Sequence, residues 1–243
     1  MSARFRQLPV TALALVAASL LSACSADDLN IVVLSARAPG DNCDFPDDTL
    51  YVSRGSLDLR PYFTESAATN PARLPVVSDQ YYQVFSWQNN LSSVPITVNS
   101  QVIDPGQGND FIADTAVYSY QYSDPSVTLA SESQNIRAVI PAGGKTADSS
   151  VPADLIQPNA FAAINASTAI DTSSQTLLVT LQYFGKLAAG GPTKNTNKVT
   201  FPLTIYRSST GALDCFAQTP GAPPAGGPCR TPGRDAPVQC TTP

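Results

Sequence analysis

Hydrophobic and polar residues alternate with a period of two along most of residues 29–207, which is the pattern of half-buried β-strands. The clearest runs cover residues 94–102, 177–183 and 199–205. In the first run, Val94, Ile96, Val98, Ser100 and Val102 fall on one face. The same alternation predicts further strands over Asn30–Ser35, Leu50–Ser53, Tyr82–Asn89, Asp114–Tyr122 and Ile136–Ile140.

Turn-forming residues separate these runs, as in Asp104-Pro105-Gly106 and Ala189-Gly190-Gly191-Pro192. About eight short strands divided by such turns predict an all-β fold, an antiparallel β-sandwich with Ig-like or jelly-roll-like packing. Pro202 cannot donate a hydrogen bond to a ladder, so we expect its strand to be an edge strand or to carry a bulge. Only residues 153–164 are compatible with a helix, and Pro158 limits that helix to one or two turns.

The first residues have a different pattern, in which Arg4 and Arg6 precede an apolar run from Leu8 to Leu21. The run is short for a permanent membrane span, and the arrangement is typical of a secretory signal peptide. Its end, Leu21-Ser22-Ala23-Cys24, resembles the lipobox of bacterial lipoproteins. That resemblance implies cleavage before Cys24 and attachment of lipid, including palmitate, to Cys24. The alternative is an ordinary signal peptide cleaved near Ala23, with Cys24 as a free thiol.

Lipidation of Cys24 also explains the odd number of cysteines, which is five. The remaining four are Cys43, Cys215, Cys229 and Cys240, an even set that predicts two disulfide bonds in an exported chain. Three pairings are possible, and we favour Cys229–Cys240 as a local clip with Cys43–Cys215 closing the domain. The predicted organisation is a signal peptide (1–23), a lipidated tether (24–28), a β-sandwich (29–217) and a Pro/Gly-rich tail with cysteines (218–243).

Several segments resemble a group of uncharacterised β-sandwich lipoproteins common in myxobacteria and related bacteria. The C-terminal segments are FPLTIYRSSTGALDC and PCRTPGRDAPVQC, and the earlier ones are GSLDL and FSWQNNL. The resemblance implies a bacterial envelope lipoprotein and carries no implied activity. Ser25 after the lipidated cysteine resembles Gram-negative lipoproteins sorted to the outer membrane, which implies a lipid-anchored protein of that membrane.

Charge and composition exclude several classes of function. The net charge is −5 with no basic cluster, so nucleic acid is excluded as a partner because its binding requires lysines and arginines that replace phosphate counterions. The chain contains no histidine, which excludes Ser-His-Asp and Cys-His catalysis and His-ligated catalytic zinc. Nucleotide-binding and G-x-S-x-G motifs are missing from the sequence. We therefore predict that the protein is not an enzyme, with a glycoside hydrolase using two carboxylates as the remaining catalytic alternative.

Two sets of residues are candidate binding sites. One is the loop DPGQGNDFIAD, in which Asp104, Asn109, Asp110 and Asp114 offer oxygen ligands to Ca²⁺. We favour a hairpin loop with turn-forming residues as the explanation, with Ca²⁺ binding as the alternative, and no other cofactor is expected. The second set is a pair of aromatic stripes in predicted strands, which we interpret as core packing, with sugar stacking as the alternative. The stripes consist of Tyr81, Phe85 and Trp87, and of Tyr118, Tyr120 and Tyr122.

These features together predict a lipoprotein anchored through Cys24 to the bacterial outer membrane. Its β-sandwich is expected to have a non-enzymatic role in structure or protein interaction, with an envelope protein or polysaccharide as partner. A carbohydrate- or Ca²⁺-binding module at the cell surface is the alternative.

Overall fold

The fold comes from a computed structural model, which describes residues 30–37, 51–60, 62–63, 75–76, 81–103, 106–143, 150–207 and 213–214. All five cysteines, the predicted signal peptide and the whole predicted tail lie outside the described residues, so the lipidation and disulfide predictions are not addressed by this structure. No helix within the described ranges is long and apolar enough to cross a membrane.

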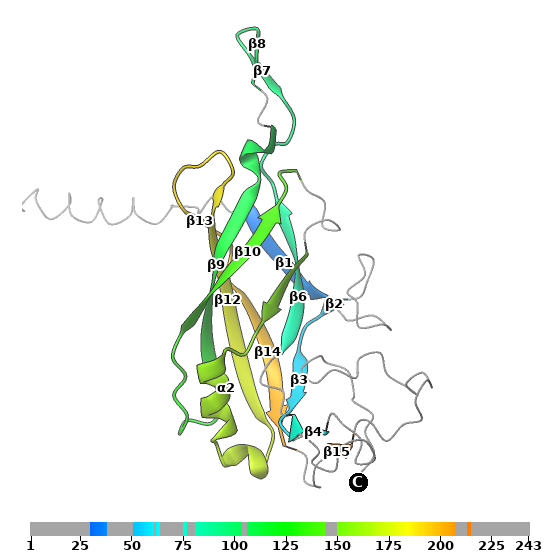
Figure 1. The fold of residues 1–243 in the computed structure, drawn as a ribbon, viewed down its shortest axis with the longest axis vertical. Coiled ribbons are helices and arrows are strands. Elements are labelled where there is room, and N and C mark those ends of the chain that lie inside the picture. The colour runs from blue at the N-terminus through cyan, green and yellow to red at the C-terminus, as the bar shows by residue number, and fades with distance from the viewer. Residues whose placement is uncertain are drawn as a thin grey trace, which may run out of the picture.

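The described chain forms a β-sandwich of two sheets, as the alternation predicted (Figure 1). One sheet has the strand order β11-β6-β1-β2, and the other has the order β10-β9-β12-β14-β3 with β13 paired to β12. The first sheet consists of β1 (Ile31–Arg37), β2 (Tyr51–Val52), β6 (Tyr82–Asn89) and β11 (Ser150–Asp154). The second consists of β3 (Gly55–Asp58), β9 (Phe111–Tyr122), β10 (Glu132–Ile140), β12 (Gln175–Leu187), β13 (Lys194–Asn195) and β14 (Val199–Tyr206).

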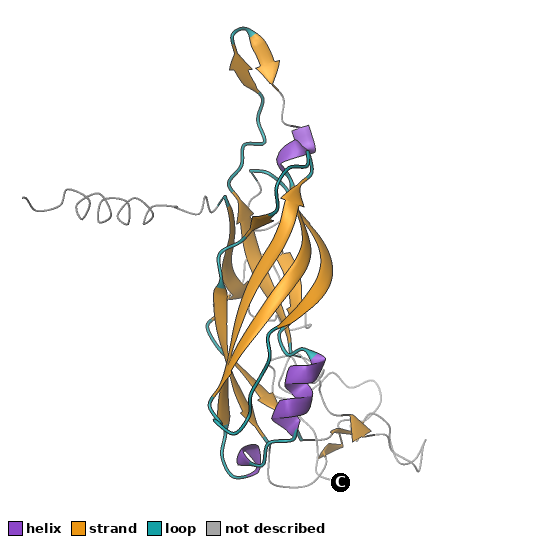
Figure 2. Cartoon of the chain, turned by 90° about the vertical axis from the view of Figure 1, so that its left-hand side faces the viewer, coloured by secondary structure: helices purple, strands orange, loops and turns teal. Residues whose placement is uncertain are grey.

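Smaller elements surround the two sheets. A small third sheet joins β4 (Tyr62–Phe63), β5 (Pro75–Val76) and β15 (Leu213–Asp214), and β7 (Ile96–Val98) pairs with β8 (Gln101–Ile103). The described helical segments are η1 (Gly106–Asn109), α2 (Pro158–Asn165) and η3 (Ala169–Asp171). Figure 2 shows α2 and η3 near one end of the sandwich and the β7–β8 hairpin at the other.

A single apolar core lies between the two sheets. Its members come from both layers, including Ile31, Phe85 and Trp87 from one sheet and Leu177 and Phe201 from the other. In the second sheet, every second residue in the middle of β12 is buried, as the period-two alternation predicted. Each of these large side chains is at most 3% exposed, so their transfer from water is the main stabilising term of the fold.

Side chains also connect the two sheets through hydrogen bonds. Asn197, which precedes β14, accepts a hydrogen bond from the Val33 amide at 2.7 Å and donates one to the Val33 carbonyl at 3.0 Å. The ladder between β1 and β6 shifts register between Val33 and Ser35. Asn197 therefore satisfies the backbone of Val33 at the irregularity, as a neighbouring strand would.

Pro202 lies inside β14, which pairs with β12 on one side and with β3 on the other. The prediction of an edge strand or a bulge at this proline is therefore wrong for the strand as a whole. Parallel pairing with β3 begins at Leu203, one residue after the proline, while Pro202 is in regular register with Leu178. The strand thus has a neighbour on only one side at the position without an amide donor, which is why the proline is tolerated.

The run from Val94 to Val102 is a hairpin, so the prediction that these alternating residues share one strand face is wrong. The strands β7 and β8 are joined by Asn99 and Ser100, whose φ angles are +50° and +64°. Two consecutive residues with positive φ form the tight turn that suits the twist of a hairpin, and asparagine is favoured there. The alternation continued through the turn by coincidence, and it concealed the reversal of the chain.

Helix α2 begins at Pro158 within the segment where a short helix was predicted, and β11 occupies the first residues of that segment. Proline fits the first helical position because its missing amide has no partner there in any helix. The helix has no cap from its own N-cap residue, Gln157. Glu132 of β10 supplies the cap instead, since its carboxylate accepts hydrogen bonds from the Ala160 amide at 2.9 Å and the Asn159 side chain at 2.8 Å.

Candidate functional site

Both aromatic stripes are part of the packed interior. Tyr81, Phe85, Trp87 and Tyr118 are 0% exposed, while Tyr120 and Tyr122 are partly buried and pack against the core. The rings of Trp87 and Tyr183 have centroids 4.3 Å apart, and Phe85 meets Phe201 edge to face at 6.3 Å. The fully buried members of both stripes stabilise the contact between the sheets.

The tyrosines of this region also have altered acidity. Burial is the largest cause that raises the pKa of Tyr118 and of Tyr120 well above the usual value of a phenol. The Tyr118 hydroxyl donates to Gln134 Oε1 at 3.0 Å, and the Tyr120 hydroxyl accepts from the Gln157 amide at 3.2 Å. Both groups remain protonated at physiological pH, so they act as polar members of the core.

The predicted Ca²⁺ loop has a different role for each residue that the structure describes. Asn109 donates to the Ser92 carbonyl at 2.9 Å, Asp110 accepts from the Ala142 amide at 2.9 Å, and the exposed Asp114 accepts from the Thr115 hydroxyl at 2.9 Å. Asp104 lies outside the described residues. Within the described part of the chain, no group of three or more metal-ligating side chains is found. The hydrogen bonds of Asn109 and Asp110 hold the loop to neighbouring segments.

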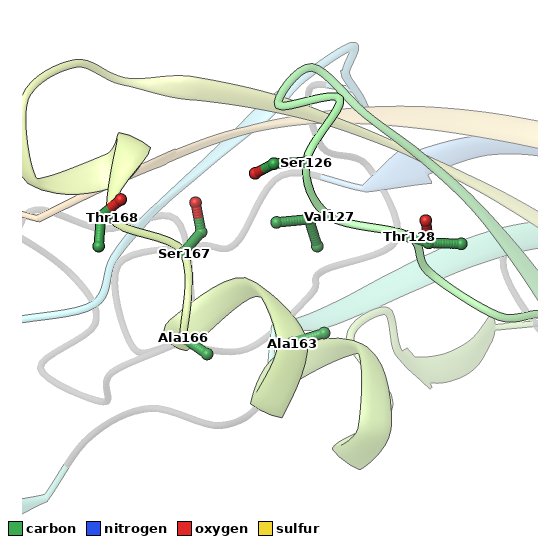
Figure 3. Close-up of a pocket in the computed structure, with 7 residues that line it drawn as sticks. All are labelled: Ser126, Val127, Thr128, Ala163, Ala166, Ser167 and Thr168. Atoms are coloured by element: carbon green, nitrogen blue, oxygen red, sulfur yellow. The ribbon is translucent and has the colours of Figure 1, made fainter.

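A shallow pocket of about 380 Å³ lies beside the C-terminal end of α2 (Figure 3). It is lined by small and hydroxyl-bearing residues from three segments: Ser126, Val127, Thr128, Ala163, Ala166, Ser167 and Thr168. Figure 3 shows the segment after β9 facing α2 and the turn that follows the helix. None of these seven lining residues has a titratable side chain, so the pocket offers hydroxyl groups and shape.

Asp124, which follows β9, holds the hydroxyl groups beside this pocket in place. Its carboxylate accepts from the Ser167 hydroxyl at 2.7 Å, from the Ser126 hydroxyl at 2.7 Å and from the Ser126 amide at 2.9 Å. These hydrogen bonds lower the pKa of the Asp124 carboxyl, and the largest effect comes from the Ser167 hydroxyl. A carboxylate with a lowered pKa is a weak base near neutral pH, so this cluster is suited to fixing the loop rather than to proton transfer.

A polar cluster is buried in the first sheet, on β1 and β6. Arg37 is 2% exposed, and its Nε donates to the Ser86 hydroxyl at 2.7 Å. The Gln83 side chain donates to the Arg37 carbonyl at 2.6 Å. Sequence reasoning missed this cluster, because Arg37 follows the predicted strand Asn30–Ser35 and a single arginine gives no sign that its side chain is enclosed.

The end of the sandwich that bears the hairpin is organised by Asn89, which is 1% exposed. Its Nδ2 donates to the Asn109 carbonyl at 2.9 Å and to the Ile140 carbonyl at 3.1 Å, and its Oδ1 accepts from the Leu91 amide at 3.1 Å. One side chain therefore joins the end of β6, the η1 turn, the end of β10 and the start of the hairpin.

Sequence analysis did not identify Asn89 as a central residue, although a signal was present. It follows Phe85 and Trp87 on the inward face of the predicted strand. A polar residue at an inward position requires hydrogen-bond partners, because an unpaired polar group in the interior is costly. The partners themselves come from distant segments and were not predictable from local pattern.

Comparison with protein-family models, with curated proteins and with solved structures finds no match to this chain.

Proposed function

We propose that this chain is a lipoprotein of the bacterial outer membrane, anchored by lipid on Cys24, whose β-sandwich serves a structural or protein-interaction role without catalysis. The observation that carries the proposal is the lipobox-like Leu21-Ser22-Ala23-Cys24 after the apolar run, followed closely by a folded domain. Strand β1 begins at Ile31, so only a short polar tether separates the anchor from the sandwich.

The physical basis of anchoring is the transfer of acyl chains from water into the bilayer. Each buried methylene contributes roughly 0.8 kcal/mol, and stable attachment requires more than one chain. The modification that the lipobox resemblance implies supplies several chains at one residue. A domain of this size would then remain at the membrane surface without a spanning helix.

The geometry of the described domain favours interaction over ligand chemistry. Four of the six stripe residues are fully buried and the other two are partly buried. Asn109 and Asp110 of the 104–114 loop make hydrogen bonds to neighbouring segments, and the pocket in Figure 3 is lined by small neutral side chains. We therefore do not advance the carbohydrate, Ca²⁺ or glycosidase alternatives. The partner that we propose is an envelope protein that contacts the outside of the sandwich.

Metabolic labelling with palmitate in a Gram-negative host tests the anchoring. Wild-type protein should incorporate the label and sediment with outer membranes, whereas the Cys24→Ala variant should remain unlabelled. Cys24→Ser serves as a matched control, because it keeps a side chain of similar size and removes the thiol that receives the lipid. An unlabelled wild-type protein, or equal labelling of the Cys24→Ala variant, would contradict the proposal.

A further inference from the structure

The β7–β8 hairpin stands apart from the rest of the described molecule. Its two strands pair with each other and with no other described strand, and Figures 1 and 2 show it projecting beyond the end of both sheets. Val94 is 64% exposed and Val98 is 47% exposed, values that are high for valine. A two-stranded ribbon with exposed apolar residues is marginally stable in water, so this arrangement favours a further contact at the hairpin.

Hydrogen bonds at the base give the hairpin a defined direction. Asn109 donates to the Ser92 carbonyl at 2.9 Å, and Asn89 accepts from the Leu91 amide at 3.1 Å. The Ser92 hydroxyl accepts from the Val94 amide at 3.3 Å. The first arm is therefore tied to the sandwich through buried and partly buried side chains, and the tip is held away from the core.

The beginning of the folded chain lies at the same end of the sandwich. Ile31 is paired with Asn89, and the Asn90 amide donates to the Asn30 carbonyl at 2.7 Å. Asn90 is the residue from which the chain continues into the hairpin arm. The tether that precedes Asn30 therefore departs beside the base of the hairpin.

The length of that tether restricts the distance between the sandwich and a lipid on Cys24. Six residue steps separate Cys24 from Asn30 in the sequence, and a fully extended chain covers at most about 3.3–3.6 Å per residue, or roughly 20 Å in total. A bilayer that holds the Cys24 lipid must then lie within this distance of the hairpin base. The hairpin points away from the sandwich at this end, so its tip is within reach of the bilayer surface.

The chemistry of the hairpin suits a lipid surface. The segment from Gln88 to Ile103 contains no charged residue, and its turn is formed by the small polar residues Asn99 and Ser100. A charged tip would resist entry into the boundary between headgroups and acyl chains, whereas valines gain from leaving water there.

We propose that the β7–β8 hairpin is a second membrane contact, which inserts its tip at the surface of the bilayer that holds the Cys24 lipid. This inference rests on the proposed lipid anchoring. The anchor keeps the hairpin at a high effective concentration next to the membrane, so a small apolar contact suffices to engage it. The lipid and the hairpin are then two membrane contacts at the same end of the sandwich. They orient the domain so that α2 and its pocket face away from the membrane.

Site-specific photocrosslinking in intact cells tests this arrangement on the full lipidated chain. A benzophenone amino acid replaces Val98 at the hairpin or Ser174 before β12, an exposed position at the opposite end. Phospholipid adducts, identified by mass spectrometry, should be at least about fivefold more abundant at position 98, because only that end is held beside the bilayer.

A second comparison removes the effect of the probe's own hydrophobicity. The probe replaces the exposed Thr97, and Val94→Ser and Val98→Ser are introduced together in the same chain. The lipid adducts should fall several-fold, while the melting temperature stays unchanged because both valines lie outside the core. Equal adduct yields with and without the two valines would overturn the role of these valines in the membrane contact.

Palmitate labelling of the same samples distinguishes failure of the hairpin contact from failure of the lipid anchoring. Labelled protein with equal lipid adducts at positions 98 and 174, or with protein adducts at position 98 in place of lipid, overturns the membrane contact and leaves the anchoring intact. Absence of the label from wild-type protein overturns the anchoring and the membrane contact with it.

Discussion

Asn89 is the residue on which the hairpin end of the sandwich most depends. Its two side-chain donors satisfy the carbonyl groups of Asn109 and Ile140, which belong to segments far apart in the chain. Replacing Asn89 with alanine would leave both carbonyls without this donor at a site where the side chain is 1% exposed. We expect Asn89→Ala to lower the free energy of unfolding by about 2–4 kcal/mol, from the cost of unpaired buried polar groups. Urea unfolding followed by circular dichroism measures the loss.

The neighbouring asparagine provides a matched control. Asn90 is exposed, and its role in the fold is carried by its main-chain amide, which alanine retains. Asn90→Ala should therefore unfold within about 0.5 kcal/mol of wild type, as surface substitutions generally do. Asn89→Asp keeps the size of the side chain but removes the donors, so it should be at least as unstable as Asn89→Ala. A stable Asn89→Asp protein would show that the donors do not matter.

At the scale of single elements, Gly185 in β12 marks the place where the long β9–β12 ladder is irregular. The register between these strands shifts between Phe184 and Gly185. A Cβ atom at Gly185 would meet the Ile112 carbonyl and would lie 2.8 Å from the Ala113 Cα, both backbone atoms of β9. Because a backbone cannot move aside as a flexible side chain can, we expect Gly185→Ala to lower the free energy of unfolding by about 2–3 kcal/mol. Chemical denaturation of the purified variant measures the loss.

A glycine without such a contact tests the interpretation of Gly185→Ala. At Gly108, in the η1 turn, a Cβ atom would lie 3.3 Å from the Ala189 Cβ, which is a side-chain contact. We expect Gly108→Ala to be close to wild type in the same experiment. If both variants lose the same stability, the close approach of β9 to Gly185 is not the cause.

The elements also show which parts of the fold the pattern of residues determines. The predicted strand Tyr82–Asn89 is confirmed at both ends, and Phe85 and Trp87 on its inward face belong to the core. The alternation did not predict β3, because its four residues form a strand through parallel pairing with β14. The pattern of residues within one segment does not identify the distant strand with which it pairs. The prediction for residues 94–102 failed for a related reason, because alternation alone does not reveal a turn made by Asn99 and Ser100.

The candidate site could be predicted from the sequence only in part. The interpretation of the aromatic stripes as core packing is consistent with the burial of Trp87 and Tyr118, because large rings in alternating strands gain most by leaving water. The projection of the hairpin and its position beside Asn30 depend on how β1 and β6 pair. That pairing forms only when the sheet assembles, so it is not predictable from the sequence of either strand alone.

At the scale of the whole molecule, the two ends of the sandwich differ in construction. At one end, the uncharged hairpin and the beginning of β1 lie together, joined through Asn89 and Asn90. At the other, Glu132 and Asp124 fix α2 and the pocket in Figure 3 through charged hydrogen bonds. This difference between the two ends agrees with the proposed arrangement, in which one end contacts a membrane and another part of the surface contacts a partner.

One core serves both sheets, and this predicts that the sandwich unfolds as a unit. Trp87 is the single tryptophan of the chain, is 0% exposed, and contacts Tyr183 of the opposite sheet with ring centroids 4.3 Å apart. Its fluorescence therefore reports the contact between the layers, whereas far-ultraviolet circular dichroism reports the strands. Because neither sheet can expose its inner face alone without losing the shared core, both signals should change at the same denaturant concentration. A fluorescence transition at lower denaturant than the circular dichroism transition would show that the layers separate first. The Val98→Ser variant should leave both midpoints unchanged, since the hairpin lies outside the core.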